Sequence, residues 1–135
     1  MRKLAVALMI LVASASYAGK VKSKDKRFEP AVRSAAEYAG SYRGPDASYG
    51  LVLALNNGQL HGNYVEMGRV AVLSTVKVDG AQFTAEASFD DGSTRVITGS
   101  FAVRTFNGAT AFGARLQGVP VEGMGAIDTF FERLD

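Results

Sequence analysis

Residues 49–66, with the sequence YGLVLALNNGQLHGNYVE, decide the fold. In the first half of this stretch every second residue is apolar and shares one face: Tyr49, Leu51, Leu53 and Leu55. A period of two is typical of a half-buried β-strand. Asn57-Gly58 follows, a pair that favours a tight hairpin turn because both turn residues must adopt positive φ. Alternation then resumes at Leu60 and continues to Tyr64, so the stretch predicts two antiparallel strands.

The same turn signal recurs along the chain, at Asp79-Gly80, Asp91-Gly92 and Asn107-Gly108, with weaker versions at Met67-Gly68 and Glu122-Gly123. The runs between the turns predict eight strands, at residues 39–44, 48–56, 59–66, 69–78, 81–89, 94–104, 109–117 and 125–134. Short connections force consecutive strands to pair antiparallel. Accumulated twist and exposed edges favour closure, and eight strands is the number at which a closed barrel is just filled by side chains or holds one small ligand. We therefore predict an all-β fold, an eight-stranded antiparallel up-and-down meander that closes into a small barrel. A curved open sheet, with one or two strands miscounted, is the alternative.

Residues 28–39 precede the predicted strands and indicate a short N-terminal helix. Pro30 suits a first helical position, and an apolar stripe follows at Val32, Ala35 and Ala36. The helix and the strands together predict a single β-barrel domain over residues 28–135, a length that supports one hydrophobic core.

The first 18 residues have the layout of a secretory signal peptide. Arg2 and Lys3 form a basic head, residues 4–12 are apolar, and Ser16 and Ala18 fit a cleavage site before Gly19. The apolar run is far shorter than the ~20 residues of a membrane-spanning helix, so we expect no transmembrane anchor. The sequence predicts a soluble protein that is exported to the periplasm or secreted.

The composition excludes several classes of chemistry and of binding partner. The chain of 135 residues contains no cysteine, so lipoprotein processing, disulfides and thiol chemistry are excluded. Residues 19–27 carry five basic residues against Asp25 and predict a flexible basic linker, with attachment to anionic lipid or polysaccharide as the alternative. This segment has no interleaved aromatic residues, so we expect no nucleic-acid partner.

Three short motifs match a known group of barrels. Gly40-Ser41-Tyr42 lies on the first predicted strand, His61-Gly62-Asn63-Tyr64 lies on the third, and Arg133 lies near the end of the last. The layout resembles the calycin group, which contains the lipocalins and avidins. Those families open on Gly-x-Trp and place an arginine across the aromatic ring, so the resemblance implies structural roles for Gly40 and Arg133. Tyr42 replaces the Trp, and because the chain has no Trp we expect no biotin site.

No catalytic or metal-binding motif stands out. His61 is the only histidine and alternates away from Leu60 and Tyr64, which predicts a surface position rather than a base or a ligand. Asp90 and Asp91 are explained by the turn at Gly92. Asp128 lies in the middle of a predicted strand, where it is either a solvent-facing residue or a buried carboxylate paired with Arg104 or Arg115. We therefore expect no metal, no cofactor and no catalytic residue.

The candidate ligand-binding residues are the aromatic residues of the predicted barrel together with one carboxylate: Tyr42, Tyr49, Tyr64, Phe112 and Asp128. Aromatic residues at a barrel mouth are a common ligand rim, although they also occur as plain core. The leading hypothesis is an exported, non-enzymatic barrel that binds a small apolar or amphipathic ligand. The alternative is an envelope protein-binding module or inhibitor, and an enzyme on the same scaffold is the weakest of the three hypotheses.

Overall fold

The computed structural model describes residues 27–135. The predicted signal peptide, residues 1–18, lies outside the described residues, and so does the predicted basic linker except for Arg27. Within residues 27–135, no helix is long and apolar enough to cross a membrane.

The described chain consists of nine strands and one short helix. In chain order these are β1 (Phe28–Pro30), α2 (Ala35–Tyr38), β2 (Gly40–Arg43), β3 (Gly50–Asn56), β4 (Gln59–Glu66), β5 (Arg69–Asp79), β6 (Gln82–Phe89), β7 (Thr94–Phe106), β8 (Ala109–Val121) and β9 (Gly125–Leu134). The last eight strands correspond one for one to the eight predicted from the turn signals.

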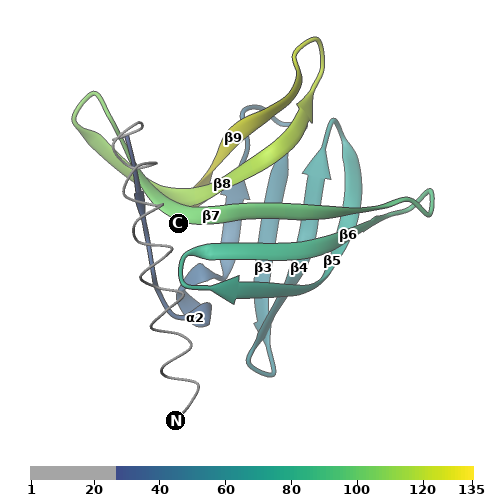
Figure 1. The fold of residues 1–135 in the computed structure, drawn as a ribbon, viewed down its shortest axis with the longest axis horizontal. Coiled ribbons are helices and arrows are strands. Elements are labelled where there is room, and N and C mark those ends of the chain that lie inside the picture. The colour runs from purple at the N-terminus through teal and green to yellow at the C-terminus, as the bar shows by residue number, and fades with distance from the viewer. Residues whose placement is uncertain (1–26) are drawn as a thin grey trace, which may run out of the picture.

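Strands β2 to β9 form a closed antiparallel barrel with up-and-down topology, as predicted. Each strand pairs with the next along the chain, and β9 closes the barrel by pairing with β2, with Tyr42 opposite Arg133. Figure 1 shows β3 and β4 behind β6 and β7, which cross them at a steep angle. Closure leaves no long unpaired edge, the usual liability of a β-sheet.

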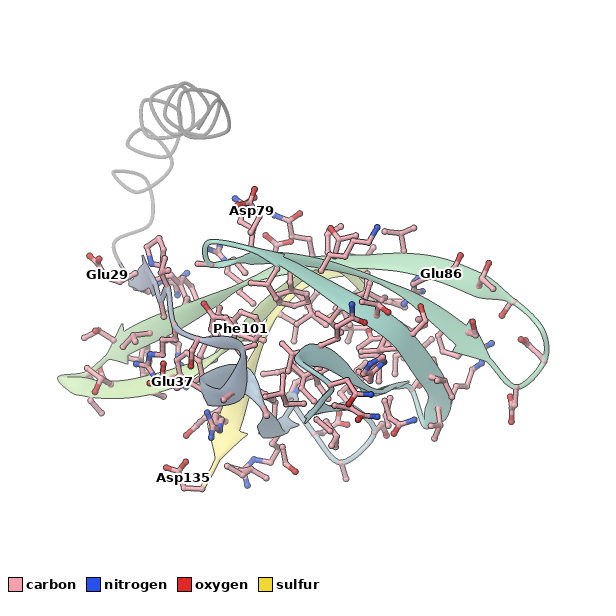
Figure 2. The ribbon with its side chains drawn as sticks, turned by 90° about the horizontal axis from the view of Figure 1, so that it is seen from below. Glu29, Glu37, Asp79, Glu86, Phe101 and Asp135 are labelled. Atoms are coloured by element: carbon pink, nitrogen blue, oxygen red, sulfur yellow. The ribbon has the colours of Figure 1, made fainter. Side chains whose placement is uncertain are left out.

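The barrel interior is filled by side chains. Along β6 the residues alternate strictly between exposed and buried, and Phe83, Ala85, Ala87 and Phe89 point inward. Phe101 on β7 has no exposed surface and lies in the middle of the interior (Figure 2). Its ring stacks on Tyr38 at 3.8 Å and contacts Phe83 at 4.8 Å between ring centroids. Mixing large aromatic side chains with alanines is how a small barrel packs its own interior.

The N-terminal region differs from the prediction. The helix covers only Ala35–Tyr38, whereas Phe28–Pro30 form strand β1, which pairs with the second half of β7. The long β7 extends past the end of β6, and β1 covers the edge that would otherwise be exposed there. Pro30 lacks a backbone N–H and is tolerated at this position because β1 is an edge strand.

The turns are of two kinds. Asn57-Gly58, Asn107-Gly108 and Met67-Gly68 have positive φ at both residues, as the hairpin signal requires. At Asp79-Gly80 and Asp91-Gly92 only the glycine has positive φ, so the prediction of two left-handed residues was wrong there. The Asp91 side chain instead accepts hydrogen bonds from the backbone and hydroxyl of Ser93, which favours a longer turn.

Strand β8 is longer than predicted. The predicted strand ended at residue 117, but Val119-Pro120-Val121 continues β8 after an irregularity in the pairing with β9 between Leu116 and Val119. Gly118, in this irregularity, has φ of +71°. A bulge accommodates an extra residue and bends the strand, so the β8–β9 hairpin extends beyond the barrel wall (Figure 1).

Candidate functional site

The three candidate tyrosines all face the barrel interior, but they do not gather in one site. Tyr42, Tyr49 and Tyr64 are at most 6% exposed. The Tyr42 ring lies 6.3 Å from that of Phe112, whereas Tyr64 hydrogen-bonds to Glu66, and the Tyr49 hydroxyl donates to the Pro120 carbonyl. The structure therefore brings together Tyr42 and Phe112, at the end of the barrel that carries α2.

An open hollow of about 300 Å³ lies at this end, which we call the mouth. Phe112 supplies an aromatic ring to it, and the remaining lining residues are Arg33, Thr110, Ala111, Glu132, Arg133 and Asp135. Behind Phe112 the rings of Tyr38 and Phe101 lie nearly parallel to it, at centroid distances of 6.4 and 6.3 Å. The buried rings hold Phe112 in place, so the mouth has a rigid apolar side.

Two arginines flank the Phe112 ring. The Arg33 guanidinium lies over the ring at 4.1 Å from its centroid, and that of Arg133 lies at 5.8 Å. A guanidinium that stacks on an aromatic face keeps its N–H donors, which point outward in the plane of the guanidinium and can bind an anion there. Within residues 27–135 Arg33 forms no ion pair shorter than 4.0 Å, so its charge is available to a ligand.

Arg133 is held by the backbone around it. Its guanidinium donates a hydrogen bond to the Glu37 carbonyl at the end of α2 and packs directly on Gly40. A Cβ at position 40 would lie only 2.6 Å from Arg133 Nε, so no larger residue fits without displacing the arginine. The Nε atom itself is buried and makes no hydrogen bond within the described chain. Gly40 and Arg133 are therefore in direct contact, and the aromatic ring under the Arg133 guanidinium is that of Phe112, at 5.8 Å.

Tyr42 lies opposite Arg133 in the register of β2 and β9, and its side chain is buried. Burial raises the pKa of Tyr42 to about 12, even though the nearby Arg133 charge works in the opposite direction. The Tyr42 hydroxyl donates to the Tyr38 carbonyl at the end of α2. Tyr42 therefore remains a neutral hydrogen-bond donor at physiological pH, and it is a support for the mouth rather than a proton-transfer group.

The acidic residues of the mouth are partly neutralised. The Glu132 carboxylate lies 3.6 Å from the Arg104 guanidinium, which approaches it from β7. Asp135 is exposed to solvent. With Arg33 and Arg133 facing the hollow, the charge nearest the Phe112 ring is positive.

The opposite end of the barrel contains a buried ion pair that the sequence analysis missed. The Glu66 carboxylate is 1% exposed, accepts a hydrogen bond from the Tyr64 hydroxyl at 2.8 Å and pairs with Arg95. Burial raises the pKa of Tyr64, and the Glu66 charge adds to this effect. Burial disfavours the charge on Arg95, but Glu66 outweighs it and raises the pKa of Arg95. The alternation could have predicted that Glu66 is buried, because Glu66 continues the series of Leu60 and Tyr64 on the inward face.

The remaining candidates lie on the outer surface. Asp128 is 52% exposed in its side chain and lies 4.0 Å from Arg115, so of the two possibilities the solvent-facing one holds. The ring of His61 contacts the Ser74 carbonyl through Nδ1 at 3.0 Å on the outside of β4. In the part of the chain that the structure describes, no cluster of three or more histidine or acidic side chains could hold a metal ion.

Comparison with known proteins gave no matching family model, no matching curated protein and no matching solved structure.

Proposed function

We propose that this protein is an exported, non-enzymatic β-barrel that binds a small amphipathic ligand carrying an anionic group, and that it does so at the mouth. The observation that carries the proposal is the Phe112 ring flanked by the guanidiniums of Arg33 and Arg133. This pairing offers an apolar surface and two cations within the same hollow.

The residues and the volume of the mouth indicate which chemical groups the ligand carries and how large it is. A short alkyl or aromatic group would rest against Phe112, and a carboxylate would receive N–H donors from Arg33 and Arg133. Hydrogen bonds between charged groups are about twice as strong as neutral ones, and arginine can bind a carboxylate with two parallel bonds. Because the interior is filled and the hollow measures about 300 Å³, the ligand is small and stays at the rim.

The barrel layout agrees with this reading. An eight-stranded up-and-down barrel is the architecture of the lipocalins. The predicted signal peptide would deliver the barrel to the periplasm or the exterior. We therefore propose a lipocalin-like barrel with a binding site at the mouth in place of a deep cup.

The test is a titration with octanoate, followed by isothermal titration calorimetry and by the amide resonances of residues 110–112 and 133. We expect octanoate to bind, and the equally long neutral alcohol octanol to bind at least about tenfold more weakly. Arg33→Gln should weaken octanoate binding by a similar factor, since one charge-assisted hydrogen bond contributes about 1.5–3 kcal/mol.

The matched control is Arg69→Gln. Arg69 also lies over an aromatic ring, that of Phe89 at 4.4 Å, but at the opposite end of the barrel. This variant should bind octanoate as the wild type does. Equal affinity for octanoate and octanol, or an unchanged affinity in Arg33→Gln, would contradict the proposal.

A second candidate function, an envelope protein-binding module, is favoured by a different observation. The outer face of β3–β5 exposes Val52, Val70 and Val72, by 46%, 51% and 58%. Val52 and Val72 lie on either side of the exposed Asn63 in the register, so the valines share one outer face with a polar side chain between them. Exposed apolar patches mark protein interaction sites when they are contiguous. Cross-linking in the native host should capture a partner protein with the wild type and lose it with Val72→Asp; capture of the same protein by both would exclude this face.

A further inference from the structure

A second and larger hollow, of about 640 Å³, lies on the outer face of the barrel over strands β5, β6, β7 and β8. It shares no lining residue with the mouth. The register shows how it is built, because residues that face one another across antiparallel strands point to the same side of the sheet. Figure 2 shows Asp79, at one edge of this hollow, projecting outward from the sheet.

Polar side chains form two adjacent rows across these strands. The first row runs from Asp79 through Gln82 to Ser100. The second row runs from Lys77 through Thr84 and Thr98 to Gln117. We call these seven residues the outer polar groove.

The depth of the groove follows from the sizes of these side chains. In the second row the short Thr84 and Thr98 occupy the middle, whereas the longer Lys77 and Gln117 stand at the two ends. Below the rows, the Phe83 ring packs so closely against Gly99 that a Cβ there would lie 2.7 Å from it. Phe83 is only 4% exposed, so the floor of the groove is backbone, with the ring sealed beneath it.

The side chains of the groove keep their hydrogen-bonding capacity. Throughout residues 27–135, the structure gives none of the seven side chains a hydrogen bond or an ion pair with another protein group. Each amide and hydroxyl side chain both donates and accepts, and the single cation, Lys77, is balanced by the single anion, Asp79. The groove therefore matches a neutral ligand whose own groups both donate and accept, and hydroxyl groups have this property.

We propose that the outer polar groove binds a neutral oligosaccharide. Among the lining residues only Val78 offers an exposed aliphatic side chain, since Phe83 is buried, so the hollow suits a ligand that combines hydroxyl groups with a small apolar face. A peptide added as an extra strand would need a free sheet edge, but the backbones of β6 and β7 are already paired on both sides at Gln82, Thr84 and Thr98. The volume lies within the range of about 300–1,000 Å³ that is usual for small-ligand sites.

The experiment is an amide chemical-shift titration of the purified protein with four neutral probes: cellohexaose, maltohexaose, chitohexaose and isomaltohexaose. We expect at least one probe to bind at millimolar concentration, with shifts confined to residues 77–84, 98–100 and 117. Hexagalacturonate, an anionic oligosaccharide, should bind no better than the neutral probes because the charges of the groove cancel.

The variants test the hydrogen bonds directly. Thr98→Val and Gln117→Leu together remove a hydroxyl and an amide from one row with little change in shape, and should weaken binding about tenfold. Thr94→Val is the matched control, since Thr94 lies on the outside of the same strand but beyond the groove. Arg33→Gln at the mouth should also leave the affinity unchanged, which separates this site from the proposed function.

The thermal midpoints of all variants are measured alongside, so that a loss of binding is not mistaken for unfolding. The proposal is overturned if none of the neutral probes shifts the groove resonances, if the shifts fall elsewhere on the barrel, or if the Thr98/Gln117 double variant binds as tightly as Thr94→Val.

Discussion

The ion pair between Glu66 and Arg95 offers a quantitative test of how the barrel holds a buried charge. Glu66 is 1% exposed and has two partners, the Tyr64 hydroxyl and the Arg95 guanidinium. Arg95→Met keeps most of the aliphatic length of the side chain but removes its charge. The carboxylate then remains in the interior with a single neutral hydrogen bond, and a buried charge without a counter-ion is strongly destabilising.

The partial exposure of Arg95 limits the loss in unfolding free energy that Arg95→Met should cause. Removing one partner of a fully buried ion pair costs about 3–5 kcal/mol. Arg95 is 37% exposed, so solvent already screens its side of the pair and the cost falls below that range, to about 2–3 kcal/mol. For a domain of this size, that loss corresponds to a fall in the thermal midpoint of roughly 10 °C.

The assay is urea unfolding at pH 7, followed by tyrosine fluorescence and far-ultraviolet circular dichroism. The matched control is Arg69→Met, because Arg69 lies over the same Phe89 ring but pairs with the exposed Asp91. That variant should lose at most about 1 kcal/mol, the usual value of a surface ion pair. The double variant Glu66→Gln/Arg95→Met should be more stable than Arg95→Met alone, since a neutral amide needs no cation. If Arg95→Met costs no more than Arg69→Met, or if the double variant gives no recovery, the reasoning is wrong.

Three further predictions concern other parts of the barrel. Burial raises the pKa of Tyr42 to about 12, above the ordinary value of about 10 for an unfolded tyrosine, so the stability from its neutral phenol is complete below about pH 10 and is lost as the pH rises towards 12. Tyr42→Phe should therefore flatten the decline of the unfolding free energy over that interval, as urea titrations would record. Gly62→Ala should destabilise the barrel by about 1–3 kcal/mol or more, because its Cβ would overlap the Val52 carbonyl oxygen, and an equal midpoint in calorimetry would contradict this contact. Phe101→Ala should cost about 3–5 kcal/mol by leaving a cavity between the Tyr38 and Phe83 rings, measured by chemical unfolding.

Much of the fold was readable from the chain because its signals are local. The period of two and the Asn-Gly turns specify strands and hairpins within a few residues, so the eight barrel strands were found close to their observed bounds. Strand β1 was missed because Phe28–Pro30 is short and pairs with residues more than seventy positions away, which leaves no periodic pattern. The continuation of β8 to Val121 was missed because a bulge breaks the alternation.

Only part of the candidate site could be predicted from the sequence. Alternation grouped Tyr49 with Leu51 and Leu53, and Tyr64 with Leu60, and the structure buries all of them, but alternation gave no information on which candidate residues lie at the same end of the barrel. Arg33 lies outside the strands, in the segment before α2, and its position over Phe112 depends on how that segment folds back. No sequence pattern within either segment connects these two residues.

By itself, then, the sequence determined the secondary structure, the antiparallel order and the inward face of most strands, because each depends on neighbours one to ten residues apart. Only the tertiary structure decided that the interior is solid, that Glu66 meets Arg95, and that two arginines flank Phe112 at the mouth. The same holds for the seven residues of the outer polar groove, which come from four strands. Such groupings depend on strand register and barrel closure, which set distances between residues far apart in the chain and leave no local trace in it.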